Sequence, residues 1–271
     1  MVPDYQIRPL LWRKLRICCT RLDLEDETKK NEIRIRYDTI QELINIVEIG
    51  DGDLFCGLGT LEDCFRMFSY VLFRPLSSPQ HIELNALDAE VPFLDPDWEF
   101  LELTHEFLLK LVLFSFVLSS PQITCPQIRI DSLRLTISNA FIRKYEYLLL
   151  SQDLRERSMV RLCLHHLYSK LCQRRALIRH VFAEMLSNIT LLNDRVAGVD
   201  EILTIYSSIV CGFVLPIKQE HIQFLTHCIL PLHKLDRLSE FSNTLTHCLL
   251  LFISQDSKLV TPVAPSKTRE S

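Results

Sequence analysis

Apolar side chains recur every three or four residues along most of the chain, with polar side chains between them. Residues 31–49 show this pattern clearly, because Ile33, Tyr37, Ile40 and Ile44 fall on one face of a helix. We therefore expect an all-α protein. The same spacing predicts further helices over 9–19, 61–73 and 98–118.

The second half of the chain is predicted to form helices in pairs. The pairs are 130–150 with 155–172, 174–191 with 199–214, and 217–230 with 238–254. They begin at intervals of about 43 residues, as HEAT-type helical hairpins do. One hairpin cannot bury its apolar stripe alone, so neighbours should stack into an α-α superhelix, a solenoid with one continuous core. We predict a HEAT-like helical repeat domain over 1–260 and a disordered tail over 261–271, where the apolar pattern ends.

Composition and missing motifs argue against several classes of protein. Only 6 of the 271 residues are glycine, which disfavours glycine-rich phosphate loops and all-β folds with many tight turns. A formal net charge of −4 disfavours a chain that coats nucleic acid. The sequence has no phosphate-loop, dinucleotide-binding, zinc-protease or serine-hydrolase motif. We therefore expect neither catalysis nor a cofactor.

The cysteines and the apolar stretches predict a compartment. Ten cysteines are scattered through helical patterns, and no two have C-x-x-C spacing, so we expect free thiols rather than zinc ligands or disulfides. The most apolar stretch, 107–118, has 12 residues and contains Lys110, whereas a membrane span needs about 20. The first residues do not resemble a signal peptide. The expected location is the cytoplasm, with the nucleus as a second compartment.

Basic side chains gather between residues 154 and 180, where seven Arg or Lys accompany one Glu. A turn near 172–174 should divide them between two helices that stay close at one edge of the stack. The interpretation as a solvated basic face remains open beside that of a groove for an acidic or phosphorylated segment. Nucleic-acid binding is less favoured, because no aromatic ladder accompanies the charges. The positions spaced by three or four are Arg161, His165, Tyr168, Cys172, Arg175 and Arg179.

Two further features are a pair of histidines within this segment and an apolar row one hairpin later. His165 and His166 are adjacent on a predicted helix, so they point to different sides and are unsuited to share a metal. An apolar row of Ile202, Ile205 and Ile209 precedes Lys218 and His221. The row is either core packing or a floor for apolar peptide anchors. Stacked helices lie about 8–10 Å apart and an extended peptide covers about 10 Å in three residues, so anchors at positions i and i+3 could span two hairpins, and a carboxylate two residues further on could reach Lys218.

Several strings resemble the B-prime (B fifty-six) regulatory subunits of protein phosphatase 2A. The resemblance covers residues of about 10–263 and is dense from 154 to 259. The strings are Leu-Arg-Glu-Arg-Ser (154–158), Leu-His-His-Leu-Tyr-Ser-Lys (164–170), Arg-Arg-Ala-Leu-Ile-Arg (174–179), Ser-Ile-Val-Cys-Gly-Phe-Val-Leu-Pro-Ile-Lys-Gln-Glu-His (208–221) and Leu-Pro-Leu-His-Lys (230–234).

This resemblance implies a non-catalytic HEAT-like solenoid. Such subunits join a scaffold subunit and a catalytic serine/threonine phosphatase subunit, and they select substrates by capturing short peptides of the pattern Leu-x-x-Ile-x-Glu, often with phosphates or acidic residues nearby. The implied pocket positions on one hairpin edge are His165, His166, Tyr168, Arg175 and Arg179. The resemblance also places Ile205 and Ile209 where the peptide isoleucine is received, and Lys218 and His221 near the peptide glutamate.

The chain also departs from the family pattern. His166 stands where the family carries arginine, so we expect weak recognition of a phosphate at the second motif position. Cys172 replaces a larger leucine, and the segment 119–150 is longer. Family members continue for several repeats beyond the point near Val263 where the resemblance ends. The alternative hypothesis is a generic helical-repeat adaptor that binds acidic or phosphorylated segments independently of the phosphatase.

Overall fold

The described part of the chain is built from helices and turns. The computed structural model describes residues 4–20, 27–49, 55, 58–76, 93–117, 130–192 and 197–259, and none of these residues forms a strand. The all-α prediction is confirmed. The predicted disordered tail, 261–271, lies outside the described residues.

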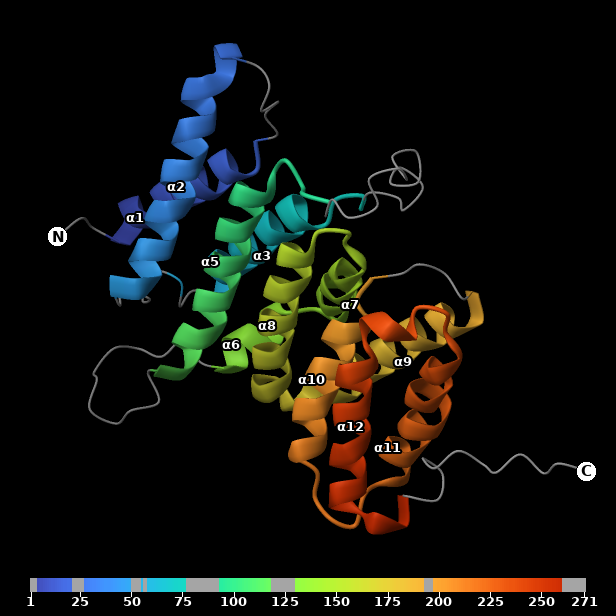
Figure 1. Cartoon of the computed structure of the whole chain (residues 1–271). Helices are drawn as coiled ribbons and strands as arrows, with labels where there is room; N and C mark the ends of the chain where they lie inside the picture. Colours follow the sequence, from blue (N-terminus) through green and yellow to red (C-terminus); the bar gives the residue numbers. More distant parts are fainter. Residues whose placement is uncertain are drawn as a thin grey trace, which may run out of the picture.

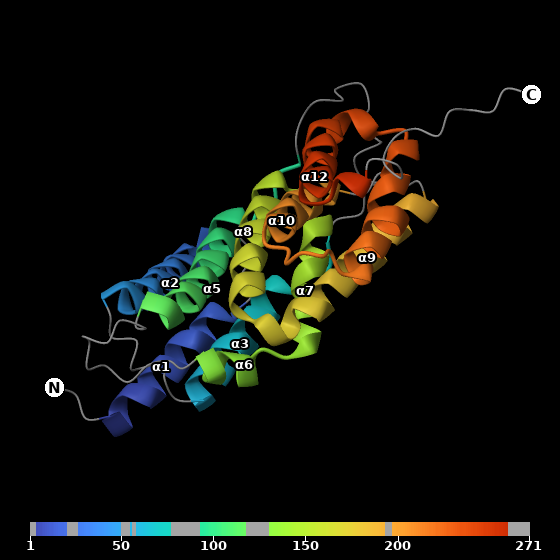
Figure 2. The same ribbon diagram turned by 90° about the horizontal axis from the view of Figure 1, so that it is seen from below.

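The helices form two layers, and the chain alternates between them (Figure 1, Figure 2). In the first layer each helix packs on the next in chain order. Its members are α2 (Lys30–Ile49), α5 (Trp98–Val117), α8 (Leu154–Lys170), α10 (Val199–Cys211) and α12 (Ser242–Gln255). The second layer contains α1 (Asp4–Cys18), α3 (Leu58–Leu72), α7 (Asn139–Tyr147), α9 (Arg175–Leu192) and α11 (Gln219–Phe224). This alternation is the helical-hairpin solenoid that the repeat spacing predicts.

The helix expected over 9–19 begins earlier, at Asp4, with Pro9 inside it. Three other predicted elements differ from the structure in kind. The helix expected over 130–150 is broken into α6 (Ile130–Thr136), α7 and a 3₁₀ turn at Leu148–Leu150. Ser138 causes the break, because its hydroxyl accepts a hydrogen bond from Phe141 N at 3.1 Å and caps α7. The helix expected over 217–230 is shorter: α11 passes into a π turn at Leu225–Ile229 and then a 3₁₀ turn at Leu230–Lys234. The helix expected over 238–254 starts with a 3₁₀ turn at Leu238–Glu240.

Caps and turns beside α8, α9 and α10 fix where the ends of these helices lie. Asp153 caps α8 by accepting a hydrogen bond from Arg155 N at 2.9 Å. The turn expected near 172–174 is present as a 3₁₀ turn at Cys172–Arg174. Gly198 precedes α10 with a φ of 102°, and a Cβ there would lie 2.5 Å from the carbonyl oxygen of Leu149. Glycine is therefore required where the α9–α10 turn packs against the preceding hairpin.

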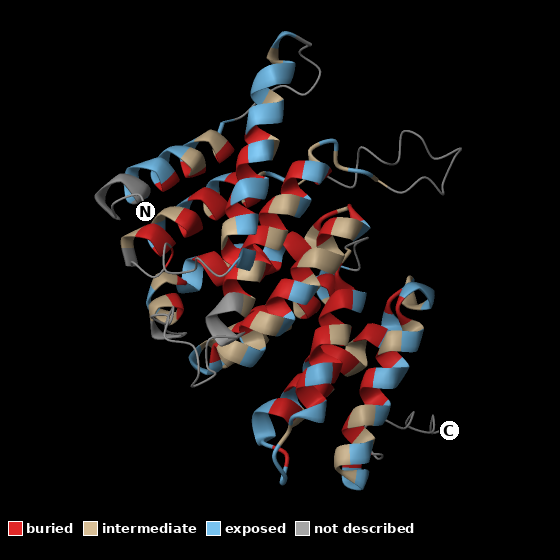
Figure 3. Ribbon diagram, turned by 90° about the vertical axis from the view of Figure 1, so that its left-hand side faces the viewer, coloured by how far each residue is buried: buried red, intermediate tan, exposed pale blue. Residues whose placement is uncertain are grey.

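The core is continuous along the stack. Buried positions run along the helix sides that face neighbouring helices, while exposed positions lie on the outer surfaces (Figure 3). Tyr145, Tyr206, Phe107 and Phe182 are among the largest fully buried side chains. The cysteines within the described ranges are free thiols, as the sequence predicts. None of the described helices is both long and apolar enough to cross a bilayer.

A buried ion network joins α8 to earlier helices. Arg74, just after α3, donates to both carboxylate oxygens of Glu156 at 2.8 and 3.0 Å and to Asp95 at 2.6 Å. Glu156 is fully buried, which by itself would raise its pKa. His105, 3.7 Å away, and the guanidinium of Arg74 outweigh burial and lower the pKa of Glu156 to about 2. The first turn of α8 is thus fixed to α3 and to the segment before α5.

Candidate functional site

Members of the predicted basic row and of the isoleucine row meet at one groove of about 510 Å³. We call it the α8–α11 groove, because it lies between the end of α8, the start of α9, the end of α10 and the start of α11. Eight of the predicted site residues line it: His165, Tyr168, Arg175, Arg179, Ile205, Ile209, Lys218 and His221. The structure therefore gathers side chains from two consecutive hairpins into one accessible hollow.

His166 is the predicted site residue that does not line this groove. Its partly buried ring packs edge-on against His165, with 5.5 Å between the ring centroids. Burial lowers the pKa of His166, and His165 and Lys170 lower it further. The resemblance alone placed this residue at the pocket. The helical geometry of adjacent positions, which points the two rings to different sides, agrees better with the structure.

Two arginines shape one wall of the groove around Tyr168. Arg175 donates from Nε to the carbonyl oxygen of Tyr168 at 2.9 Å and from Nη2 to that of Ser169 at 3.0 Å. These bonds satisfy carbonyls that the end of α8 leaves free. The Arg175 guanidinium also lies 5.3 Å from the centroid of the Tyr168 ring. Arg179 Nη1 donates to Tyr168 Oη at 3.1 Å. The ring of Tyr168 is thereby fixed at both ends.

Across the groove, Arg179 meets an acidic residue of α11. Arg179 Nη2 donates to Glu220 Oε1 at 3.0 Å. The side chain of Arg179 is 16% exposed and that of Glu220 is 50% exposed. The same carboxylate oxygen lies 3.6 Å from His221 Nε2. Sequence reasoning assigned no site role to Glu220; its only signal was its position directly before His221.

His221 is held as a neutral ring. It stacks on Phe213, with ring centroids 4.0 Å apart and an interplanar angle of 25°. Burial lowers the pKa of His221, and the cation of Arg179 lowers it further against the opposing effect of Glu220. The lowered pKa favours the neutral imidazole, which offers the groove a hydrogen bond rather than a charge.

The floor is apolar and the rim is cationic. Ile205 and Ile209 are 1% and 7% exposed, so they belong to the core and at the same time form the floor of the groove. The isoleucine row is therefore core packing, and two of its three members also face the groove, whereas Ile202 is fully buried and does not line it. Lys218 is exposed at the start of α11 and has no carboxylate partner among the described residues. With Arg175 and Arg179 it sets three cations in the lining against the carboxylate of Glu220.

Some residues that line the groove differ from those that helical spacing predicts. Arg161 belongs to the predicted basic row but does not line the groove. Cys172 does line it, as an exposed residue at the turn between α8 and α9. The sequence did not predict part of the apolar lining. That part comes from the non-helical segment after α10, where helical periodicity gives no information. The missed apolar residues of that segment are Phe213 and Val214.

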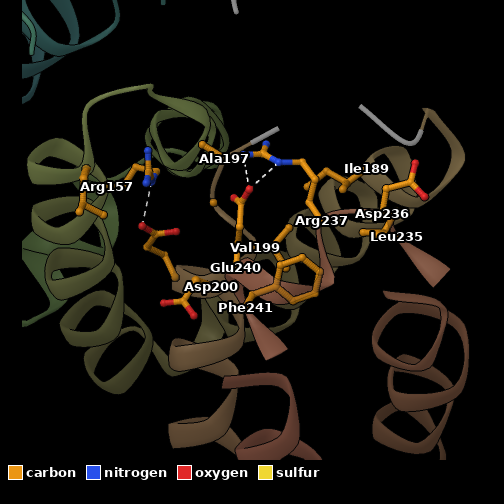
Figure 4. Close-up of a pocket in the computed structure, with 13 residues that line it drawn as sticks. Arg157, Ile189, Ala197, Val199, Asp200, Leu235, Asp236, Arg237, Glu240 and Phe241 are labelled. Atoms are coloured by element: carbon orange, nitrogen blue, oxygen red, sulfur yellow. Dashed lines mark hydrogen bonds and ion pairs between the residues drawn. The ribbon is translucent and has the colours of Figure 1, made fainter. Parts of the chain in front are cut away.

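A second pocket, of about 370 Å³, lies at the opposite edge of the same hairpins (Figure 4). Arg157 Nε donates to Glu201 at 2.8 Å, and Arg237 Nε donates to Glu240 at 2.7 Å. Both arginines are thus paired, and four carboxylates in the lining outnumber them. An acidic ligand is therefore better accommodated by the α8–α11 groove. Among the described residues, no group of three His, Cys, Asp or Glu side chains is placed to hold a metal ion.

Comparisons with known proteins give one consistent family. The family model described as "Protein phosphatase 2A regulatory B subunit (B56 family)" matches residues 1–266. The chain is 32% identical over 268 residues to the B' theta isoform of the 57 kDa regulatory subunit of serine/threonine protein phosphatase 2A from Arabidopsis thaliana, covering 97% of this chain and 52% of that protein. It is 28% identical over 269 residues to the delta 1 isoform of the 56 kDa regulatory subunit from Schizosaccharomyces pombe, covering 97% of this chain and 46% of that protein. The chain thus spans about half the length of the curated relatives it matches. These relatives are named as regulatory subunits, in line with the prediction of a non-catalytic protein.

Proposed function

Because the chain belongs to the B56 family of protein phosphatase 2A regulatory B subunits, we propose that it recruits substrates to the phosphatase by binding short Leu-x-x-Ile-x-Glu peptides in the α8–α11 groove. One observation carries the proposal: the groove combines a buried isoleucine floor with an excess of cations at its rim. A peptide with an apolar anchor followed closely by a carboxylate matches both properties.

The positions of the lining residues support a particular arrangement of the peptide. Ile205 and Ile209 offer an apolar surface to the peptide isoleucine, whose burial supplies affinity. Lys218, without a carboxylate partner in the described chain, offers a cation to the peptide glutamate, and His221 offers a neutral hydrogen-bonding ring. Tyr168 and Arg175 form the wall that the preceding peptide residues would contact. An extended peptide covers about 10 Å in three residues, enough to pass from one helix to its neighbour.

Phosphate recognition at the second motif position plays little part in this proposal. The family arginine is replaced by His166, which lies outside the groove and has a lowered pKa. A neutral imidazole cannot replace the two parallel hydrogen bonds that a guanidinium gives to a phosphate. An unphosphorylated motif should therefore bind nearly as well as one phosphorylated at that position.

The direct test is a titration of this protein into a labelled Leu-x-x-Ile-x-Glu peptide, followed by fluorescence anisotropy. We expect saturable binding, and a loss of roughly tenfold or more when the peptide isoleucine is replaced by alanine. Absence of binding by the unmodified peptide would overturn the assignment of the groove. Indifference to the isoleucine, together with binding that collapses as salt is raised, would instead favour the adaptor that recognises acidic segments by charge.

Assembly with the scaffold and catalytic subunits of the phosphatase is a separate part of the proposal, because the chain spans about half the length of its relatives. Co-purification from a mixture of the three proteins tests it independently of peptide binding. Recovery of peptide binding without co-purification would leave substrate capture standing and remove the regulatory role.

A further inference from the structure

Glu220 is paired with Arg179, a cation of the groove that the proposed peptide could otherwise bind. Its carboxylate accepts a hydrogen bond from Arg179 at 3.0 Å and lies 3.6 Å from His221, beside the place proposed for the peptide glutamate. We infer that Glu220 acts as an internal acidic ligand of Arg179, which the carboxylate of an incoming peptide must displace, and that it thereby limits the affinity of the groove for acidic peptides. This inference rests on the proposed function.

The two partners differ in how freely they can move. Arg179 is 16% exposed and its Nη1 is held by Tyr168 Oη at 3.1 Å, so it stays in place. Glu220 is 50% exposed and comes from the first turn of the short helix α11, so its carboxylate can turn into water. The exchange therefore removes Glu220 from the guanidinium and leaves Arg179 available to the peptide.

Charge repulsion leads to the same conclusion. A peptide carboxylate that reaches Lys218 and His221 lies close to Glu220, and like charges at such range weaken binding. Replacement of Glu220 by glutamine removes both the repulsion and the competing charge. The glutamine oxygen can still accept the hydrogen bond from Arg179, so the guanidinium keeps its position.

The experiment compares the unmodified protein with Glu220→Gln against two labelled peptides, one with glutamate and one with glutamine at the sixth motif position. We expect Glu220→Gln to bind the glutamate peptide about twofold to fivefold more tightly, as removal of one partly exposed like charge implies. Affinity for the glutamine peptide should change less than about twofold.

A matched control is available at the opposite edge. Glu240 is 55% exposed and paired with Arg237 in the second pocket (Figure 4). It does not line the α8–α11 groove. Glu240→Gln makes the same change in net charge and should leave both affinities unchanged. Equal or weaker binding of the glutamate peptide by Glu220→Gln, while the unmodified protein binds it, would overturn the inference and leave the proposed function intact. If the unmodified protein binds neither peptide, the proposed function fails and this inference fails with it.

Discussion

Arg179 Nη1 donates a hydrogen bond to Tyr168 Oη over 3.1 Å, and this bond connects α8 to α9 across the turn between them. Arg179 lies one turn into α9 and Tyr168 near the end of α8, so the bond fixes the wall of the groove from both helices. The same guanidinium also reaches Glu220 of α11, so one cation contacts three helices that border the groove.

The phenylalanine variant of Tyr168 tests this wall. Tyr168→Phe keeps the ring beneath Arg175 but removes the oxygen that accepts from Arg179. We expect the free energy of unfolding to fall by about 1–2 kcal/mol, as loss of a hydrogen bond to a charged group implies, and the affinity for the Leu-x-x-Ile-x-Glu peptide to fall by roughly threefold to tenfold. Urea unfolding and peptide titration measure the two effects. Tyr147→Phe, at an exposed tyrosine of α7 away from the groove, should change neither.

Lys218 provides a test of charge recognition that does not involve folding. It is exposed, has no carboxylate partner among the described residues and lines the groove. Lys218→Ala should therefore leave the free energy of unfolding within about 0.5 kcal/mol of that of the original protein. Its affinity for the glutamate peptide should fall by about 10- to 150-fold. The affinity for the peptide with glutamine in place of glutamate should fall much less. Lys234→Ala, an exposed lysine outside the groove, serves as control; equal losses for both variants would contradict the assignment of Lys218.

Helical periodicity predicted much of the groove because its members repeat at helical spacing. Tyr168 and Arg175 lie on either side of a turn that the sequence placed near 172–174, and Ile205 and Ile209 are separated by one helical turn. Local pattern is sufficient for such relations, because a helix fixes the direction of each side chain relative to its neighbours.

Partners that are distant in sequence could not be predicted in this way. Glu220 pairs with Arg179 from 41 positions away, and its place directly before His221 does not reveal that pairing. Glu156 stands among arginines in a string typical of a solvated surface, yet it is buried and paired with Arg74, which lies 82 positions earlier. Pairing of this kind depends on how the hairpins stack, and periodicity within one helix carries no information about that.

The buried pair of Arg74 and Glu156 predicts a large effect on stability. Arg74→Ala leaves the fully buried, ionised Glu156 without its main partner, and such losses cost about 3–5 kcal/mol. Urea unfolding at pH 7 measures the loss. Adding Glu156→Gln should recover part of it, because the uncompensated charge is gone. Arg66→Ala removes an arginine of α3 that is 74% exposed, and it should change stability by less than about 1 kcal/mol. A small loss in Arg74→Ala would show that the pair does not anchor α8.

Glu146 of α7 predicts a dependence of stability on pH. Its side chain is fully buried, and neither carboxyl oxygen has a hydrogen-bond partner among the described residues. Burial raises the pKa of Glu146 from 4.5 to about 9; the cation of Arg143 opposes this and the charge of Glu184 adds to it. The folded protein therefore keeps a proton that the unfolded chain releases above pH 4.5.

Since the folded state binds more protons than the unfolded state between pH 4.5 and about 9, the free energy of unfolding should fall as pH rises through this window. Glu146→Gln mimics the protonated acid at every pH and removes that fall. Relative to the original protein, it should gain on the order of 4–5 kcal/mol at pH 8 and little at pH 4.5. Urea unfolding at several pH values gives the difference directly, with Glu240→Gln, at a carboxylate that is 55% exposed, as control. Parallel pH profiles for Glu146→Gln and the original protein would show that Glu146 is ionised in the folded state.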